Sequence, residues 1–150
     1  MTIIGVWSSV ILRYNDPMTT RLDHVNVQTM KLDDTVAFYR DVIGLEQRDP
    51  PGLDPKLVQW LHDDSGHALI HVSTVGSLLA DGEGYREGGK TGAVHHVALN
   101  CWGHDAMIDT LKRHGLTYRQ NHVTVIDLKQ IFVEDPNGVL IELNYPAGQH

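Results

Sequence analysis

The chain has 150 residues, 41% of them hydrophobic and 21% charged, which is the length and balance of one compact domain with an ordinary core. The formal net charge of −7 argues against nucleic acid or an anionic membrane as partner, because both are bound by basic surfaces. Cys101 is the only cysteine and no apolar run approaches the roughly 20 residues that span a bilayer, so we expect a cytoplasmic protein without disulfides.

Residues 1–20 are expected to form an N-terminal extension, or arm, outside the domain. Met18 stands just ahead of the first expected strand and looks like a natural start. The alternative is an extra edge strand, because Ile3 and Val6 are good strand formers. We expect a single domain over residues 21–146.

An internal repeat organises that domain. The segment LDHVNV at 22–27 resembles VHHVAL at 94–99, and LIHV at 69–72 parallels LIEL at 140–143. Between these landmarks each copy has a polar break, a helical pattern and then Gly-Leu, so each is expected to form one strand, one helix and three further strands. The two modules are expected at about 21–75 and 93–146.

Each module has one expected helix. The first begins at Asp33 or Asp34, whose carboxylate can cap the N-terminus, and ends at Gly44. The second carries apolar residues up to Leu111 at helical spacing and ends at Gly115. We expect each helix to pack on a four-stranded antiparallel sheet.

The other strands and turns are predicted from the alternation of apolar and polar residues and from turn-forming residues. The glycine-rich segment 76–92 is expected to link the modules, and the Asp-Pro-Asn-Gly sequence at 135–138 to form the turn between the last two strands. The later strands of the two modules are expected at 57–61, 67–75, 122–126, 129–134 and 138–144.

Alternation also gathers metal-competent side chains on one face of each sheet. Side chains two apart share a face, so Val25 and Val27 face the helix while His24 and Asn26 face away. A merely solvated face would carry Lys, Glu and Thr rather than His and Asn at repeat-equivalent positions. The same alternation places on this face the side chains of His67, His71, His96, Asn100 and Glu142.

These motifs resemble the vicinal oxygen chelate superfamily, which includes glyoxalase I, bleomycin-binding proteins and type I extradiol dioxygenases. The resemblance covers residues 21–146 and is carried by LDHV around His24, HHVAL around His96 and DPNGVLIEL around Glu142. It implies an α+β fold in which two βαβββ modules form an incomplete barrel around a metal cup. It also implies a small-molecule substrate, and a homodimer in which the modules share a cup within one chain or exchange halves between chains.

By this resemblance, His24, His96 and Glu142 bind one divalent metal ion. Two histidines and one carboxylate leave three positions open, the pattern that favours Fe²⁺, although Mn²⁺, Ni²⁺, Co²⁺ or Zn²⁺ could occupy it. His95 points the other way and is expected to support the site or the fold. His71 stands where glyoxalase-like members place a fourth ligand, Glu or Gln, so it is either an unusual fourth ligand or an acid/base group.

The resemblance suggests three functions. The first is an extradiol-type, ring-cleaving dioxygenase on a small aromatic diol, with His67 as acid/base group, although Phe132 stands where that family has a tyrosine ten positions before the glutamate. The second is a glyoxalase-like lyase or isomerase, in which His71 moves a proton. The third is a metal-free small-molecule-binding resistance protein, which would lack the ligand set that this chain retains.

His67 and His71 are the candidate catalytic residues. They lie four apart on one expected strand, roughly 13 Å apart at the rise of a strand, so only one can lie beside the metal. His71 aligns with Glu142 in the repeat and is expected at the metal. His67 is expected near the mouth of the cup.

Overall fold

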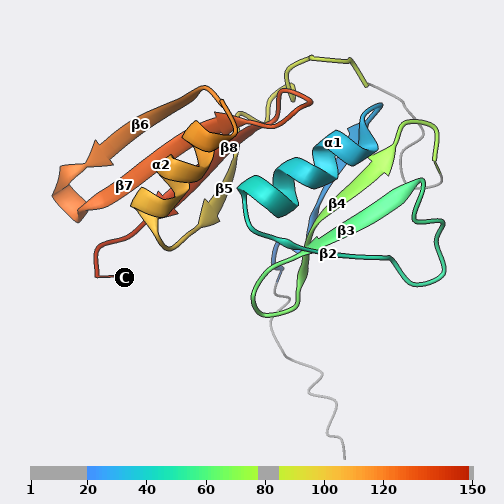
Figure 1. Ribbon diagram of the computed structural model, residues 1–150, viewed down its shortest axis with the longest axis horizontal. Helices are drawn as coiled ribbons and strands as arrows, with labels where there is room; N and C mark the ends of the chain where they lie inside the picture. The colour runs from blue at the N-terminus through green and yellow to red at the C-terminus, as the bar shows by residue number, and fades with distance from the viewer. Residues whose placement is uncertain (1–19, 78–84, 149–150) are drawn as a thin grey trace, which may run out of the picture.

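The computed structural model describes residues 20–77 and 85–148, and it contains two four-stranded sheets, each covered on one face by a helix (Figure 1). The arm expected over residues 1–20 lies, apart from residue 20, outside the described residues. The first module consists of β1 (Val25–Thr29), α1 (Leu32–Ala37), the π-helical turn η1 (Phe38–Val42), β2 (Glu46–Arg48), β3 (Val58–His62) and β4 (Ala68–Thr74). The second consists of β5 (Val97–Asn100), α2 (His104–Arg113), β6 (Tyr118–Val123), the 3-10 turn η2 (Thr124–Ile126), β7 (Leu128–Glu134) and β8 (Leu140–Tyr145). None of the described helices is long and apolar enough to cross a membrane.

The two modules have the same topology, as the internal repeat predicts. The strand orders are β1-β4-β3-β2 and β5-β8-β7-β6. In each module the chain leaves the first strand, passes through the helix, enters the sheet at its far edge and returns strand by strand (Figure 1). The α+β arrangement of two βαβββ modules is therefore confirmed.

The expectation of purely antiparallel sheets is wrong. β1 pairs with β4 in parallel, and β5 pairs with β8 in parallel, while the other pairs are antiparallel. The alternation of side chains has a period of two in both kinds of strand, so the sequence pattern does not distinguish them. The mixed sheet places each module's first strand beside its last, which is where the candidate ligands lie.

The sixth strand begins earlier than expected, at Tyr118 rather than at 122. Residues 124–126 form the 3-10 turn η2 instead of continuing the strand, and Asp127 ends that turn with a φ of 48°. β6 is an edge strand whose central residues are all exposed, so it carries no alternation of apolar and polar residues. Its bounds were for that reason poorly marked in the sequence.

One hydrophobic core lies between the helices and the sheets and continues across both modules. The turn at 135–138 joins them by polar contacts: the Tyr39 hydroxyl donates a hydrogen bond to Asp135 at 3.0 Å, and the Thr29 hydroxyl donates one to Asn137 at 2.7 Å. Tyr39 and Thr29 are fully buried. The turn therefore fixes the second module against η1 and β1 of the first.

Candidate metal centre

The second module brings two of the predicted ligands together. His96 immediately precedes β5, and Glu142 lies in β8, opposite Ala98 in the parallel register. The side chains face away from α2, and His96 Nε2 lies 3.1 Å from Glu142 Oε2. Only 8% of Glu142 is exposed. We call His96 and Glu142 the second half-site.

Neighbouring side chains orient this pair. Gln130 Nε2 donates a hydrogen bond to Glu142 Oε1 at 2.6 Å, which leaves Oε2 turned toward His96. The Nδ1 atoms of His95 and His96 lie 2.9 Å apart, so His95 contacts the ring nitrogen that does not face the carboxylate. Hydrogen bonds of this kind from outside the ligand set hold metal ligands in the productive orientation.

The donor atoms of the second half-site fit a divalent metal. Two neighbouring ligands at right angles, each about 2.1 Å from an ion, have donor atoms about 3.0 Å apart. The separation of 3.1 Å between His96 Nε2 and Glu142 Oε2 agrees with that value. An imidazole nitrogen and a buried carboxylate oxygen are also suitable donors for Fe²⁺, Mn²⁺, Co²⁺, Ni²⁺ or Zn²⁺.

The first module holds the equivalent pair, His24 and His71, which we call the first half-site. Their rings stack with centroids 3.8 Å apart and an interplanar angle of 17°. His24 Nδ1 donates to the Asp23 carboxylate at 2.7 Å, because a carboxylate only accepts, so Nε2 is the ring nitrogen that does not face Asp23. Desolvation by burial, followed by repulsion from His24, lowers the pKa of His71. This burial and repulsion favour the neutral form of the His71 ring.

The registers show that the two half-sites correspond. His71 lies opposite Asn26 in the parallel pair β1–β4, and Glu142 lies opposite Ala98 in the parallel pair β5–β8. Asn26 and Ala98 stand two positions after His24 and His96, the predicted ligands of their modules. His71 is thus level with Glu142, as the alignment of the two copies predicts.

One chain does not bring all three predicted ligands together. Within residues 20–77 and 85–148, no group of three or more His, Cys, Asp or Glu side chains lies close enough to hold a metal ion. His24 lies with His71 on the first sheet, and His96 lies with Glu142 on the second. The chain therefore carries two half-sites rather than one complete ligand set.

His67 lies beside the first half-site but outside the stack. Its Nε2 donates to the carbonyl oxygen of Asp23, the residue that also orients His24. His67 is exposed.

Two neighbours of the half-sites, Gln130 and Arg119, were not singled out from the sequence. Trp60 lies opposite His71 and stacks on it with centroids 4.5 Å apart, while Phe132 lies opposite Glu142 with its ring 6.5 Å from that of His96. Gln130 could have been found, because it stands two positions before Phe132 on an expected strand. Arg119, whose guanidinium lies over Phe132, was missed because its strand was expected to begin at 122.

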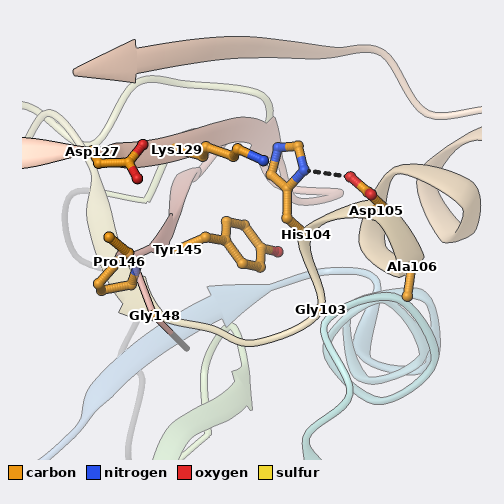
Figure 2. A pocket seen from close by; sticks show the side chains of 10 residues that line it. Gly103, His104, Asp105, Ala106, Asp127, Lys129, Tyr145, Pro146 and Gly148 are labelled. Carbon is orange, nitrogen blue, oxygen red and sulfur yellow. Dashed lines mark hydrogen bonds and ion pairs between the residues drawn. The ribbon is translucent and has the colours of Figure 1, made fainter. Parts of the chain in front are cut away.

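A cavity of about 410 Å³ lies elsewhere, on the helix-covered face of the second module (Figure 2). Lys129 and Tyr145 line it and pair across β7 and β8, so alternation turns them away from Gln130 and Glu142. His104 contacts Asp105 at 2.9 Å at its edge (Figure 2). This cavity contains none of the half-site residues.

Comparisons with known proteins give a family match. The model of the Glyoxalase/Bleomycin resistance protein/Dioxygenase superfamily matches residues 21–143. No curated protein matches the chain closely enough to count as a relative.

Solved structures share the fold. A putative glyoxalase family protein from Bacillus anthracis is 21% identical with a TM-score of 0.65, and the match covers 87% of this chain and 98% of that one. The fosfomycin resistance protein FosX from Listeria monocytogenes is 18% identical with a TM-score of 0.61, covering 87% and 97%. A glyoxalase/dioxygenase from Nostoc punctiforme is 15% identical with a TM-score of 0.64, covering 97% and 99%. At these identities the likeness shows the fold alone.

Proposed function

Because the chain belongs to the glyoxalase, bleomycin resistance protein and dioxygenase superfamily, we propose that it is a divalent-metal-dependent enzyme whose site is completed by a second copy of the chain. The observation that carries the proposal is the correspondence of the two half-sites, each of which presents ligand-type side chains on the face turned away from its helix. His24 and His96 are each 36% exposed at the side chain, so both remain accessible to a facing surface.

The proposed assembly is a homodimer in which the first module of one copy faces the second module of the other. A two-fold axis makes two identical sites, each with His24 from one protomer and with His96 and Glu142 from its partner. Two ligands from one chain hold a metal weakly, and the third completes the set. Pairing of half-sites between copies is supported by the lack, among the described residues, of any group of three ligand-type side chains that could hold a metal ion.

The bound ion would supply a Lewis acid that chelates two adjacent oxygen atoms of a small-molecule substrate. His24, His96 and Glu142 would hold it, and Gln130 and Asp23 would orient two of these ligands. Fe²⁺ is the proposed metal, because two histidines and one carboxylate leave three positions open.

Extradiol-type cleavage of a small aromatic diol is the reaction that we propose first, because the ligand set suits it. His67 would exchange the substrate's proton with solvent, which its exposed position supports. Phe132 stands where the related dioxygenases have a tyrosine, so this protein would cleave a diol without the help of a tyrosine hydroxyl group.

The placement of His71 favours a second candidate, a lyase or isomerase that moves a proton on an α-hydroxycarbonyl substrate. His71 stacks on both His24 and Trp60, and its lowered pKa favours the neutral form of the ring. A neutral imidazole at this place could accept a proton from a carbon next to the chelated oxygens.

Anaerobic purification, metal analysis and two activity screens test the proposal. We expect close to one Fe²⁺ per chain, and oxygen uptake with catechols if the first reaction is right. Incorporation of solvent deuterium into an α-hydroxyketone, without oxygen uptake, would instead identify the second reaction. If the purified protein retains no divalent metal yet binds small aromatic molecules, the proposal is contradicted. A metal-free binding protein would then be the remaining function.

A further inference from the structure

Arg119 is placed to face the same cup as the second half-site. It lies in β6 opposite Phe132, and Phe132 lies in β7 opposite Glu142. Residues that are paired across neighbouring strands share a face of the sheet, so all three side chains are on the face turned away from α2. Arg119 itself is exposed.

Phe132 holds the guanidinium in place. The Arg119 Cζ atom lies 4.0 Å from the centroid of the Phe132 ring, a cation–π contact, and the same ring lies edge-on to His96 at 6.5 Å. A guanidinium stacked on a ring keeps its N–H groups free around its rim. These donors therefore stand within the length of one small molecule from the His96 ring.

The first module supplies an internal comparison. Arg48 lies opposite Trp60, as Arg119 lies opposite Phe132. Arg48 is neutralised by Glu46, two positions earlier on the same face, through bonds of 2.9 and 2.7 Å.

The position equivalent to Glu46 in the second module is Thr117, two positions before Arg119. In the part of the chain that the structure describes, no carboxylate oxygen lies within 4.0 Å of the Arg119 guanidinium. Of two equivalent arginines, one is already paired and the other keeps its donors free.

We propose that Arg119 binds an anionic group of the substrate, a carboxylate or a phosphonate, while the metal-binding oxygens of the same molecule face His96 and Glu142. The inference rests on the proposed function and narrows it to substrates that carry an oxyanion beside the chelating oxygens. Arg119 is a specificity residue in this arrangement. Phe132, which stands where the dioxygenase resemblance has a tyrosine, positions the Arg119 guanidinium.

The test compares three probes on the Zn²⁺-loaded dimer by isothermal titration: 3,4-dihydroxybenzamide, 3,4-dihydroxybenzoate and 3,4-dihydroxyphenylphosphonate. Zn²⁺ is chosen because it has no redox chemistry and so does not support the oxidative cleavage of a catechol. The amide matches the carboxylate in shape but not in charge. We expect the wild type to bind at least one anionic probe about ten-fold more tightly than the amide, the scale of a charge-assisted hydrogen bond. The two anionic probes distinguish carboxylate from phosphonate recognition.

Three variants make the result specific. Arg119→Gln and Thr117→Glu should both abolish the preference for the anion, the second by recreating next to Arg119 the pairing that Glu46 gives Arg48. Arg48→Gln removes the equivalent arginine of the first module and should keep the preference. Equal binding of all probes by the metal-loaded wild type, or an unchanged preference in Thr117→Glu, would overturn the inference while leaving the metal proposal standing.

A metal-free measurement separates the two proposals. In metal-free protein, titration with benzoate should shift the NMR signal of the Arg119 Nε–H group, and the shift should be absent in Thr117→Glu. If Zn²⁺ does not bind but this shift is seen, the metal proposal fails and the anion site stands. If the signal does not move at millimolar benzoate, the anion site is wrong whatever the metal content.

Discussion

His71 and Glu142 hold the same place in the two modules, each in the last strand and each opposite the residue two positions after the histidine that immediately precedes the module's first strand, His24 or His96. An imidazole therefore stands in one copy where a carboxylate stands in the other. The pseudo-symmetry of the fold gives two half-sites of similar shape, and this one difference in chemistry makes them complementary rather than redundant. Glu142 supplies the only negative charge among the proposed ligands.

Replacing Glu142 by Gln should weaken metal binding at least about ten-fold, because the amide keeps the shape but removes that charge. Metal content after dialysis against a weak chelator measures the effect. Glu134→Gln is the matched control, since Glu134 is an exposed residue at the end of the neighbouring strand β7. Equal metal content in Glu142→Gln and the control would rule out Glu142 as a ligand.

His67 and His71 should behave differently when each is changed to Ala. His71 stacks on His24, so its loss should disturb the metal site itself and lower metal content. The His67 side chain donates to the backbone carbonyl of Asp23 and does not stack on His24, so its loss should lower turnover while metal stays bound. Metal analysis and activity on the same preparations separate the two effects. The opposite pattern would mean that His67, rather than His71, is the residue at the metal.

Tyr39→Phe should destabilise the fold by about 1–3 kcal/mol, because it removes the hydrogen bond to Asp135 from a buried site that joins the two modules. Urea unfolding followed by tryptophan fluorescence gives the free energy of unfolding. Tyr85→Phe serves as control, since Tyr85 lies in the segment that links the modules. Equal stability of the two variants would show that the turn at 135–138 does not depend on this contact.

Cys101 should resist alkylation until the pH is high. Burial raises the pKa of its thiol to about 11, above the ordinary value of 9.0, so little thiolate is present near neutrality. Between these values the folded state keeps a proton that the unfolded state has released, so stability falls as the pH rises from 9 toward 11. The rate of reaction with iodoacetamide should therefore rise near pH 11 in folded protein and near pH 9 in urea. Coincident profiles would show that the thiol is not held in its buried place.

The sequence predicted the face of the sheet on which each candidate ligand lies. It was less successful in predicting how close these ligands lie to one another. Alternation placed Val27 and Ile141 in the core and Glu142 on the opposite face, because the period of a strand leaves no other choice. Alternation describes the side chains within one strand, however, and does not predict the distance between the two sheets. The split of His24 from His96 and Glu142 follows from the packing of the modules, which no single motif encodes.

Edge strands were the other source of error. The central residues of β6 are exposed, so Arg119 carried no pattern that marked it as part of a strand. It became visible as a neighbour of the half-site only through its register with Phe132. The internal repeat could have been used to place Arg119 in a strand, since Arg48 and Arg119 occupy equivalent places in the two copies.

The sharing of one site between two chains is the central claim, and mixing two inactive variants tests it most directly. His24→Ala and Glu142→Gln chains, carrying different affinity tags, are co-expressed, and the mixed dimer is isolated through both tags. If each site takes His24 from one chain and His96 and Glu142 from the other, one site of the mixed dimer has both changes and the other has neither. The account therefore predicts one tightly bound metal ion per mixed dimer and almost none in either parental dimer. A mixed dimer as empty of metal as its parents would show that each site is built within a single chain, and would contradict the account.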